Sequence, residues 1–176
     1  MLPYHKLDVD DYDEPELFKI ITSIGTEWFD YFDFKTALLP TDLLCRDDFF
    51  SWLYERHPYT AGIIKLPKNT CYSWHSDTLR GVCVNTLLNF NGNSHCLFAP
   101  NREEVAHGFI ELQYEPYKRY VFNNQVDHMV VNFEEERYLL TLEFVANKFE
   151  LSFDRLMQDV KGLHQPTLSQ GVKCRS

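Results

Sequence analysis

With 176 residues, the chain has the length of one domain and is long enough to bury a substantial hydrophobic core. Hydrophobic residues make up 44% of it and charged residues 24%, which excludes a mainly disordered chain. The formal net charge of -9 disfavours nucleic acid or an anionic membrane as a partner, because such a surface repels phosphate groups.

The cysteine count and the apolar runs predict where the protein works. The five cysteines are odd in number and show no paired spacing. We find no signal peptide and no apolar run long enough to cross a bilayer. These features together predict a cytoplasmic protein with reduced thiols.

Two amphipathic helices are predicted in the first third of the chain. Apolar residues recur at helical spacing over residues 16–29. Residues 41–56 repeat the pattern, with Thr41 or Asp42 as the N-cap. The aromatic side chains on both helices are expected to be core contacts.

From Gly62 onward the pattern changes to short apolar segments separated by turn residues. The predicted strands span residues 62–66, 82–88, 95–98, 109–114, 117–122, 129–133 and 138–145, with a turn at 89–93. Residues 151–160 predict a closing helix that ends near Gly162, followed by a loose tail.

Short strands at this spacing favour an antiparallel sandwich or barrel. The fold expected is mainly β with flanking helices, built on a double-stranded β-helix of the cupin-like, jelly-roll kind. We expect one domain over residues 1–176, with a helical part at 1–61, the jelly-roll core at 62–146 and a C-terminal helix and tail at 147–176.

The residues that carry chemistry are centred on His75 and Asp77. An imidazole and a carboxylate two residues apart can bind one metal ion where the chain turns out of a strand, and His128 on a later strand can supply the third ligand. Two histidines and one carboxylate leave open coordination positions, the arrangement of non-haem Fe(II) oxygenases. The alternative is a surface turn in which Asp77 bonds to its own backbone.

Arg137 follows His128 at the start of the next predicted strand. Iron held by such a triad commonly needs a bidentate co-substrate. A guanidinium is the group best shaped to hold the far carboxylate of that molecule through two parallel hydrogen bonds.

This order of motifs resembles the Fe(II)- and 2-oxoglutarate-dependent oxygenases. The matching runs are His75-x-Asp77, His128-x-Val130-x-Asn132 and Arg137-x-x-Leu140-x-Leu142. Val121-Phe122-Asn123 followed by His128, Asn132 and Arg137 is similar to the aspartyl/asparaginyl β-hydroxylase and small amino-acid hydroxylase group. The resemblance covers residues 62–145.

The resemblance implies a hydroxylase in which His75, Asp77 and His128 bind Fe(II) and Arg137 holds the C5 carboxylate of 2-oxoglutarate. O2 would be consumed, succinate and CO2 released, and a C–H bond of an amino acid or protein side chain hydroxylated. The carboxylate of Asp77 argues against a halogenase, which leaves this position free for chloride.

The chain departs from the related hydroxylases on the strand after the first ligands. They often carry Arg-x-His there, whereas this chain has Cys83-Val-Asn85. Asn85 is expected to donate a hydrogen bond to the C1 carboxylate, and Arg80 to replace the missing arginine in substrate binding. Tyr72 and Trp74 either line the pocket, Tyr72 at the co-substrate and Trp74 at the substrate, or fill the core.

Two other functions stay open. One is a cupin-type metal enzyme that does not use 2-oxoglutarate, in which Arg137 is structural. The other is a non-catalytic jelly-roll binding or structural module. The sequence predicts neither the substrate nor the oligomeric state.

Overall fold

The computed structural model describes residues 2–9, 19, 23, 26–32, 34–89, 93–101, 103–105 and 108–164. Most of the helix expected over residues 16–29, the middle of the turn expected at 89–93 and the tail after residue 164 lie outside these ranges. Phe29, the last residue of that expected helix, begins a strand. No helix in the described ranges is long and apolar enough to cross a membrane.

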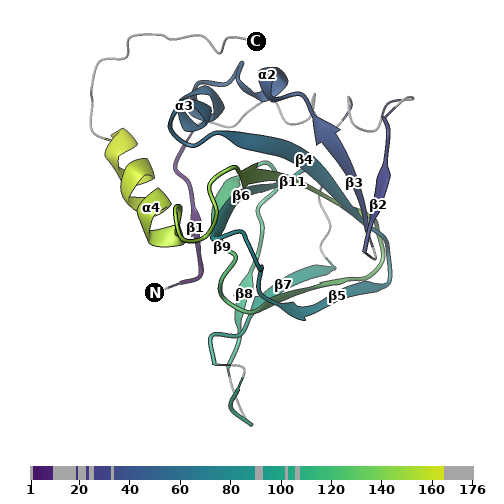
Figure 1. Cartoon of the computed structure of the whole chain (residues 1–176). Coiled ribbons are helices and arrows are strands. Elements are labelled where there is room, and N and C mark those ends of the chain that lie inside the picture. Colours follow the sequence, from purple (N-terminus) through teal and green to yellow (C-terminus); the bar gives the residue numbers. More distant parts are fainter. Residues whose placement is uncertain are drawn as a thin grey trace.

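The strands form a seven-stranded and a four-stranded antiparallel sheet that face each other (Figure 1). The large sheet has the order β1 (Tyr4–Lys6), β9 (Arg119–Asn123), β6 (Val82–Leu87), β11 (Arg137–Phe144), β4 (Tyr59–Leu66), β3 (Phe34–Leu39) and β2 (Phe29–Tyr31). The small sheet has the order β5 (Thr70–His75), β10 (His128–Asn132), β7 (Ser94–Phe98) and β8 (Ile110–Leu112). The predicted jelly-roll fold is therefore confirmed.

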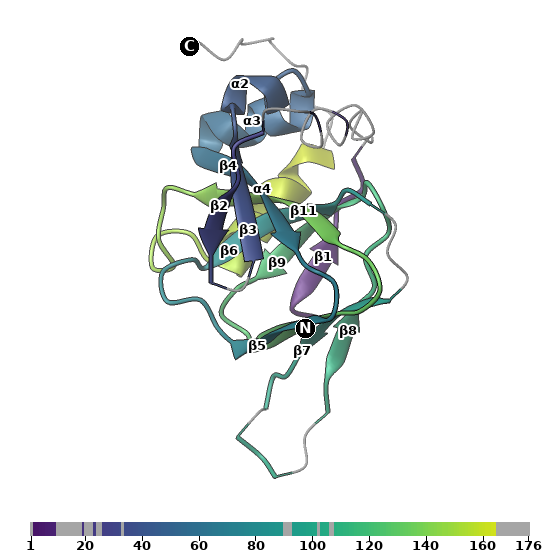
Figure 2. The same ribbon diagram turned by 90° about the vertical axis from the view of Figure 1, so that its right-hand side faces the viewer.

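Both faces of the large sheet are covered. Helices α2 (Thr41–Leu44), α3 (Asp48–Arg56) and α4 (Phe153–Lys161) lie outside the barrel, on the far side of the large sheet from the small one (Figures 1 and 2). Ile63 of β4 and Leu142 of β11 pack in one core with Phe50 of α3 and Leu156 of α4. Their alternate neighbours on the strands face the barrel interior. Because it is covered on both sides, β6 is buried along its whole length, including the polar residues Asn85 and Thr86.

The single helix expected over residues 41–56, capped by Thr41 or Asp42, is wrong. It is divided into α2 and α3, and Pro40 occupies the N-cap position of α2 without a side-chain cap bond. The division arises because the Asp47 side chain accepts a hydrogen bond from the Phe50 amide and so starts α3.

The helical N-terminal part expected at 1–61 is also wrong in its described portion. It contains β1, β2, β3 and the start of β4, so the β core begins well before residue 62. β1 pairs with β9, and β3 pairs with β4, so these strands extend the large sheet at both edges. β1 and β2 are three residues long, too short to show alternation. In β3, burial recurs at Phe34 and Ala37, a spacing of three that does not indicate a strand.

A buried ion pair fixes α3 to the large sheet. Arg119 of β9 donates from Nη1 to Asp47 Oδ1 over 3.1 Å and from Nη2 to Asp47 Oδ2 over 2.8 Å. Its guanidinium also lies 4.3 Å from the ring centroid of Phe50. The side chain of Arg119 is 1% exposed, so this pair is shielded from water.

Candidate metal centre and cavity

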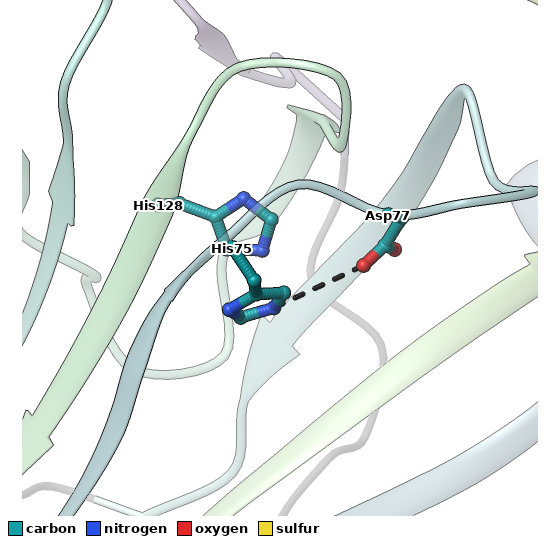
Figure 3. A group of neighbouring side chains, drawn as sticks. All are labelled: His75, Asp77 and His128. Carbon is teal, nitrogen blue, oxygen red and sulfur yellow. Dashed lines mark ion pairs between the residues drawn. The ribbon is translucent and has the colours of Figure 1, made fainter. Parts of the chain in front are cut away.

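His75, Asp77 and His128 come together at one end of the small sheet (Figure 3). His75 ends β5, His128 begins β10, and the two are direct partners in the antiparallel pairing. Asp77 lies just beyond β5. One donor atom from each residue lies within 4.8 Å of the others, and His75 Nε2 is 3.9 Å from Asp77 Oδ1. Across the described residues, this is the one group of three such side chains.

Both imidazoles are held in the tautomer that suits a metal ligand. His75 Nδ1 is 2.7 Å from the Ser73 carbonyl oxygen, and His128 Nδ1 is 2.9 Å from that of Val126. Because a carbonyl oxygen only accepts, Nδ1 carries the proton in each ring. Nε2 is therefore left with its lone pair on both histidines.

His128 is also neutral at ordinary pH. Burial, assisted by the nearby His75, lowers the pKa of His128 to about 4. The ring centroids of His75 and His128 lie 4.2 Å apart, so the two Nε2 atoms are close enough to bind one shared ion. A metal ion can bind His128 without first displacing a proton.

The carboxylate of Asp77 is oriented by two donors on the same oxygen. Asn124 Nδ2 donates to Oδ2 over 2.7 Å, and Arg80 Nε lies 2.7 Å from the same atom. Oδ1 is left to face His75. The Asp77 amide is further bonded to the Asn124 carbonyl oxygen over 2.9 Å. The alternative of a surface turn closed by Asp77 on its own backbone is therefore wrong.

A cavity of about 650 Å³ opens between the two sheets and is lined by all three of these residues. Arg137 of β11 also lines it and is only 4% exposed. Its guanidinium lies 5.2 Å from the centroid of the Tyr114 ring, and no acidic group of the described chain pairs with it. The cavity therefore contains a buried cation that has no acidic partner among the described residues.

Asn85 and Tyr114 line the cavity beside Arg137. Asn85 Nδ2 donates to the Tyr114 hydroxyl oxygen over 3.3 Å. Burial raises the pKa of Tyr114 well above its usual range, so its hydroxyl keeps its proton and can donate to a bound ligand. Burial likewise raises the pKa of Cys83 to about 11, so this thiol stays protonated.

Tyr72 and Trp74, expected near the site, have different places. Tyr72 lines the cavity and its ring centroid is 4.2 Å from that of His75, whereas Trp74 is not among the lining residues. The cause is a bulge in β5: Tyr72 pairs with Val130 and His75 with His128, so β5 has one extra residue between these pairs. The bulge reverses which side chains face the barrel and turns Trp74 away.

Asn132, part of the family pattern, holds the backbone. Its Nδ2 donates to the carbonyl oxygens of Pro67 and Glu135, both over 2.7 Å. It thereby ties the turn after β4 to the turn before Arg137 and lies outside the cavity lining.

The cavity residues that the sequence did not single out include Tyr114, Asn124 and Glu143. The signal for Asn124 was its neighbour Asn123, which belongs to the family pattern. In the structure Asn123 closes a turn by accepting from the Gln125 amide, and Asn124 reaches the metal site. Nothing in the sequence marks Tyr114 or Glu143, since both face the cavity only through strand pairing.

The side chains at this centre fit a divalent transition-metal ion. Two imidazole nitrogens and a carboxylate oxygen are the ligands that non-haem Fe(II) takes, and the other coordination positions would face the cavity. The donor atoms already lie within 4.8 Å of one another, so small side-chain rotations suffice to close them on one ion.

No family model matches the chain, and no curated protein matches its sequence. Solved structures do match. A 2OG-Fe(II) oxygenase family oxidoreductase from Burkholderia pseudomallei is 15% identical, with a TM-score of 0.59 over 87% of this chain and 88% of that one. A prolyl-4-hydroxylase from Pseudomonas putida is 14% identical, with a TM-score of 0.61 over 82% and 92%.

A third match is HygX from Streptomyces hygroscopicus, with nickel and 2-oxoglutarate bound. It is 9% identical, with a TM-score of 0.58 over 82% of this chain and 83% of that one. The chain has the fold of the 2OG-Fe(II) oxygenases. The matched proteins carry different names and are all less than 25% identical to this chain, so the shared fold does not single out one group of hydroxylases.

Proposed function

We propose that the protein is an Fe(II)- and 2-oxoglutarate-dependent dioxygenase that hydroxylates a C–H bond of an amino acid or a protein side chain. One observation carries the proposal. Arg137, a buried cation without an acidic partner in the described chain, lines the same cavity as the cluster of His75, Asp77 and His128. A buried unpaired charge is unfavourable, so a ligand carboxylate is its expected partner.

A 2-oxo dicarboxylic acid satisfies both ends of this arrangement. Its oxo acid end would chelate the ion held by the triad, and its far carboxylate would be bound by Arg137 and the Tyr114 hydroxyl. A metal enzyme that does not use 2-oxoglutarate would leave Arg137 without a partner, which is why we rank that alternative second.

When bound, iron and 2-oxoglutarate supply the oxidation: O2 is reduced, the oxo acid loses CO2 to become succinate, and one oxygen atom is inserted into the substrate C–H bond. The protein positions these groups. Asp77 and the two imidazoles keep fixed orientations through their backbone and Asn124 bonds. Apolar wall residues, Phe122, Val130 and Leu139, limit the access of water around them.

The proposal predicts two different defects in a succinate assay. His75→Ala removes an ion ligand, so succinate formation from 2-oxoglutarate and Fe(II) is expected to fall to background. Arg137→Lys keeps the charge but not the parallel pair of donors. We expect the half-saturating concentration of 2-oxoglutarate to rise about ten- to a hundred-fold, the loss of a charge-assisted hydrogen bond.

The matched control is Arg46→Lys, an exposed arginine outside the cavity, for which both values should stay at wild type. Undiminished succinate formation in His75→Ala would reject the metal centre. An unchanged 2-oxoglutarate dependence in Arg137→Lys would reject the co-substrate and favour a metal enzyme of another kind.

A further inference from the structure

One face of β11 places opposite charges at the two ends of the cavity. Arg137, Leu139, Thr141 and Glu143 alternate along the strand and all line the cavity. Glu143 lies six positions after Arg137, about 20 Å along an antiparallel strand. The co-substrate therefore occupies the cationic end, and the acidic end is left for another molecule.

Glu143 has nothing in the described chain to neutralise it. Its side chain is exposed, and no described residue donates a hydrogen bond to its carboxylate or forms an ion pair with it. Across the sheet Glu143 pairs with Cys83 near the start of β6, which places it next to the segment that carries Arg80.

Arg80 offers the complementary charge at the same end. Its Nε is used by Asp77, but its two Nη atoms have no acceptor among the described residues, and its side chain is 29% exposed and lines the cavity. Arg80 and Glu143 are thus neighbours that form no ion pair with each other.

We propose that Arg80 and Glu143 form the substrate subsite and that the substrate is a free α-amino acid. The Arg80 Nη atoms would bind its carboxylate, and Glu143 its ammonium group. This inference rests on the proposed oxygenase function. Although Arg80 Nε is paired with Asp77, its two Nη atoms and the nearby Glu143 carboxylate match a molecule with both charges on one carbon, because each of these groups meets its opposite.

The surroundings of the two charges favour an apolar side chain on that amino acid. Leu38 and Leu79 line the cavity and are each 71% exposed, so they offer apolar surface to a bound side chain. Gly62 of β4 faces the same space. A Cβ there would meet only Ala37 and Thr36, at 3.5 and 3.6 Å, so its absence leaves room in the cavity beyond what packing requires.

The test measures the binding of amino acids to the full chain loaded with Ni(II) and 2-oxoglutarate, by titration calorimetry. The probes are the twenty common amino acids, and for each one that binds, the amine without its carboxylate and the acid without its ammonium group. We expect binding only from amino acids with both charges. Glu143→Gln should weaken it about ten- to a hundred-fold and Glu143→Lys abolish it, with the affinity for 2-oxoglutarate unchanged.

Glu103→Gln, which removes an exposed carboxylate outside the cavity, is the matched control and should bind as wild type does. The inference is overturned if no amino acid binds, if the singly charged analogues bind equally well, or if Glu143→Gln binds normally. Each of these results leaves 2-oxoglutarate binding and succinate formation intact. Failure of the proposed function itself would instead appear as loss of 2-oxoglutarate binding to the wild-type protein.

Discussion

Asn124 shows how much of the metal site depends on a residue that touches no ion. It is 2% exposed and binds Asp77 twice, with its side-chain nitrogen at Oδ2 and its carbonyl oxygen at the Asp77 amide. With Oδ2 occupied, the carboxylate can offer the ion one oxygen, in one direction. Residues that orient ligands in this way contribute substantially to metal affinity.

Asn124→Ala is therefore expected to lower the affinity for Ni(II) about ten- to a hundred-fold while the protein stays folded, because Asp77 can then rotate. Calorimetric titration of the metal-free protein measures this. The control is Asn123→Ala, since Asn123 accepts only from the Gln125 amide in the adjacent turn. Equal affinities for the two variants would show that Arg80 alone orients Asp77.

The ligands themselves could be predicted at this scale, and the residues that orient them could not. His75, Asp77 and His128 have a recognisable order and chemistry in the sequence. Asn124 differs from Asn123 only in which way its side chain points, and that is decided by the end of β9 and the turn that follows it.

At the scale of elements, residues 76–81 carry Asp77 between β5 and β6 and are fixed from two sides. Gln125 Nε2 donates to the carbonyl oxygens of Asp77 and Arg80, over 2.9 and 2.6 Å. On the other side the Lys148 amide donates to the Leu79 carbonyl oxygen over 2.8 Å. This segment reaches its place because the chain after β11 packs closely against it.

Gly81 makes that packing possible. A Cβ there would overlap the Leu151 carbonyl oxygen and lie 2.9 Å from Lys148 Cα, and neither is a flexible side chain. We expect Gly81→Ala to lower the free energy of unfolding by about 1–3 kcal/mol and to weaken Ni(II) binding, because the Asp77 segment must shift. Urea denaturation and metal titration measure the two effects.

The matched control is Gly162→Ala at the end of α4, where a Cβ meets nothing within 4 Å and the backbone is already helical. That change should leave stability equal or raise it by up to about 1 kcal/mol. If both alanine variants behaved alike, the close approach at Gly81 would have no energetic consequence.

Strand prediction succeeded where burial alternates or is continuous, and failed elsewhere. From β4 onward, every observed strand except β5 was predicted, with bounds within a few residues of those in the structure. β5 was not predicted. In β5 the bulge beside His75 disturbs the alternation, and this same bulge turns Trp74, but not Tyr72, away from the cavity. A search for regular alternation in the sequence therefore misses irregularities such as this bulge, which help to form the site.

At the scale of the whole molecule, the pair of Arg119 and Asp47 joins the helical layer to the sheet. Asp47→Asn keeps an oxygen to cap α3 but removes the charge facing a buried guanidinium. We expect it to lower the free energy of unfolding by about 1.5–3 kcal/mol, because a charge-assisted pair shielded from water is replaced by a neutral hydrogen bond. Equilibrium urea unfolding measures it.

Asp48→Asn, one residue along on the same helix, is the control. Asp48 is exposed in the first turn of α3, so its loss should cost no more than about 1 kcal/mol through the helix dipole. Comparable losses in the two variants would mean that the pair with Arg119 contributes little beyond an ordinary surface charge.

The set of residues that line the cavity is the feature that sequence patterns predict least well. Arg137 was expected to hold a carboxylate because of its place after His128. Glu143 enters the same space from β11, whose pairing with β6 joins residues more than fifty positions apart. Tyr114 enters it from the segment just after β8, which is placed by the pairing of β8 with β7. Such long-range register is a property of the folded chain, and local composition contains no trace of it.

Backbone carbonyl oxygens contact the Nδ1 atoms of both imidazoles, so the fold itself orients the two nitrogen ligands. A site with two nitrogen ligands and one oxygen ligand discriminates poorly among manganese, iron, cobalt, nickel and zinc ions, because their affinities for such a site follow the Irving–Williams order. Which of them the protein carries inside a cell is then decided by the local supply of each metal. A surplus of another metal ion that binds more tightly would block the proposed oxygenase activity without changing the fold.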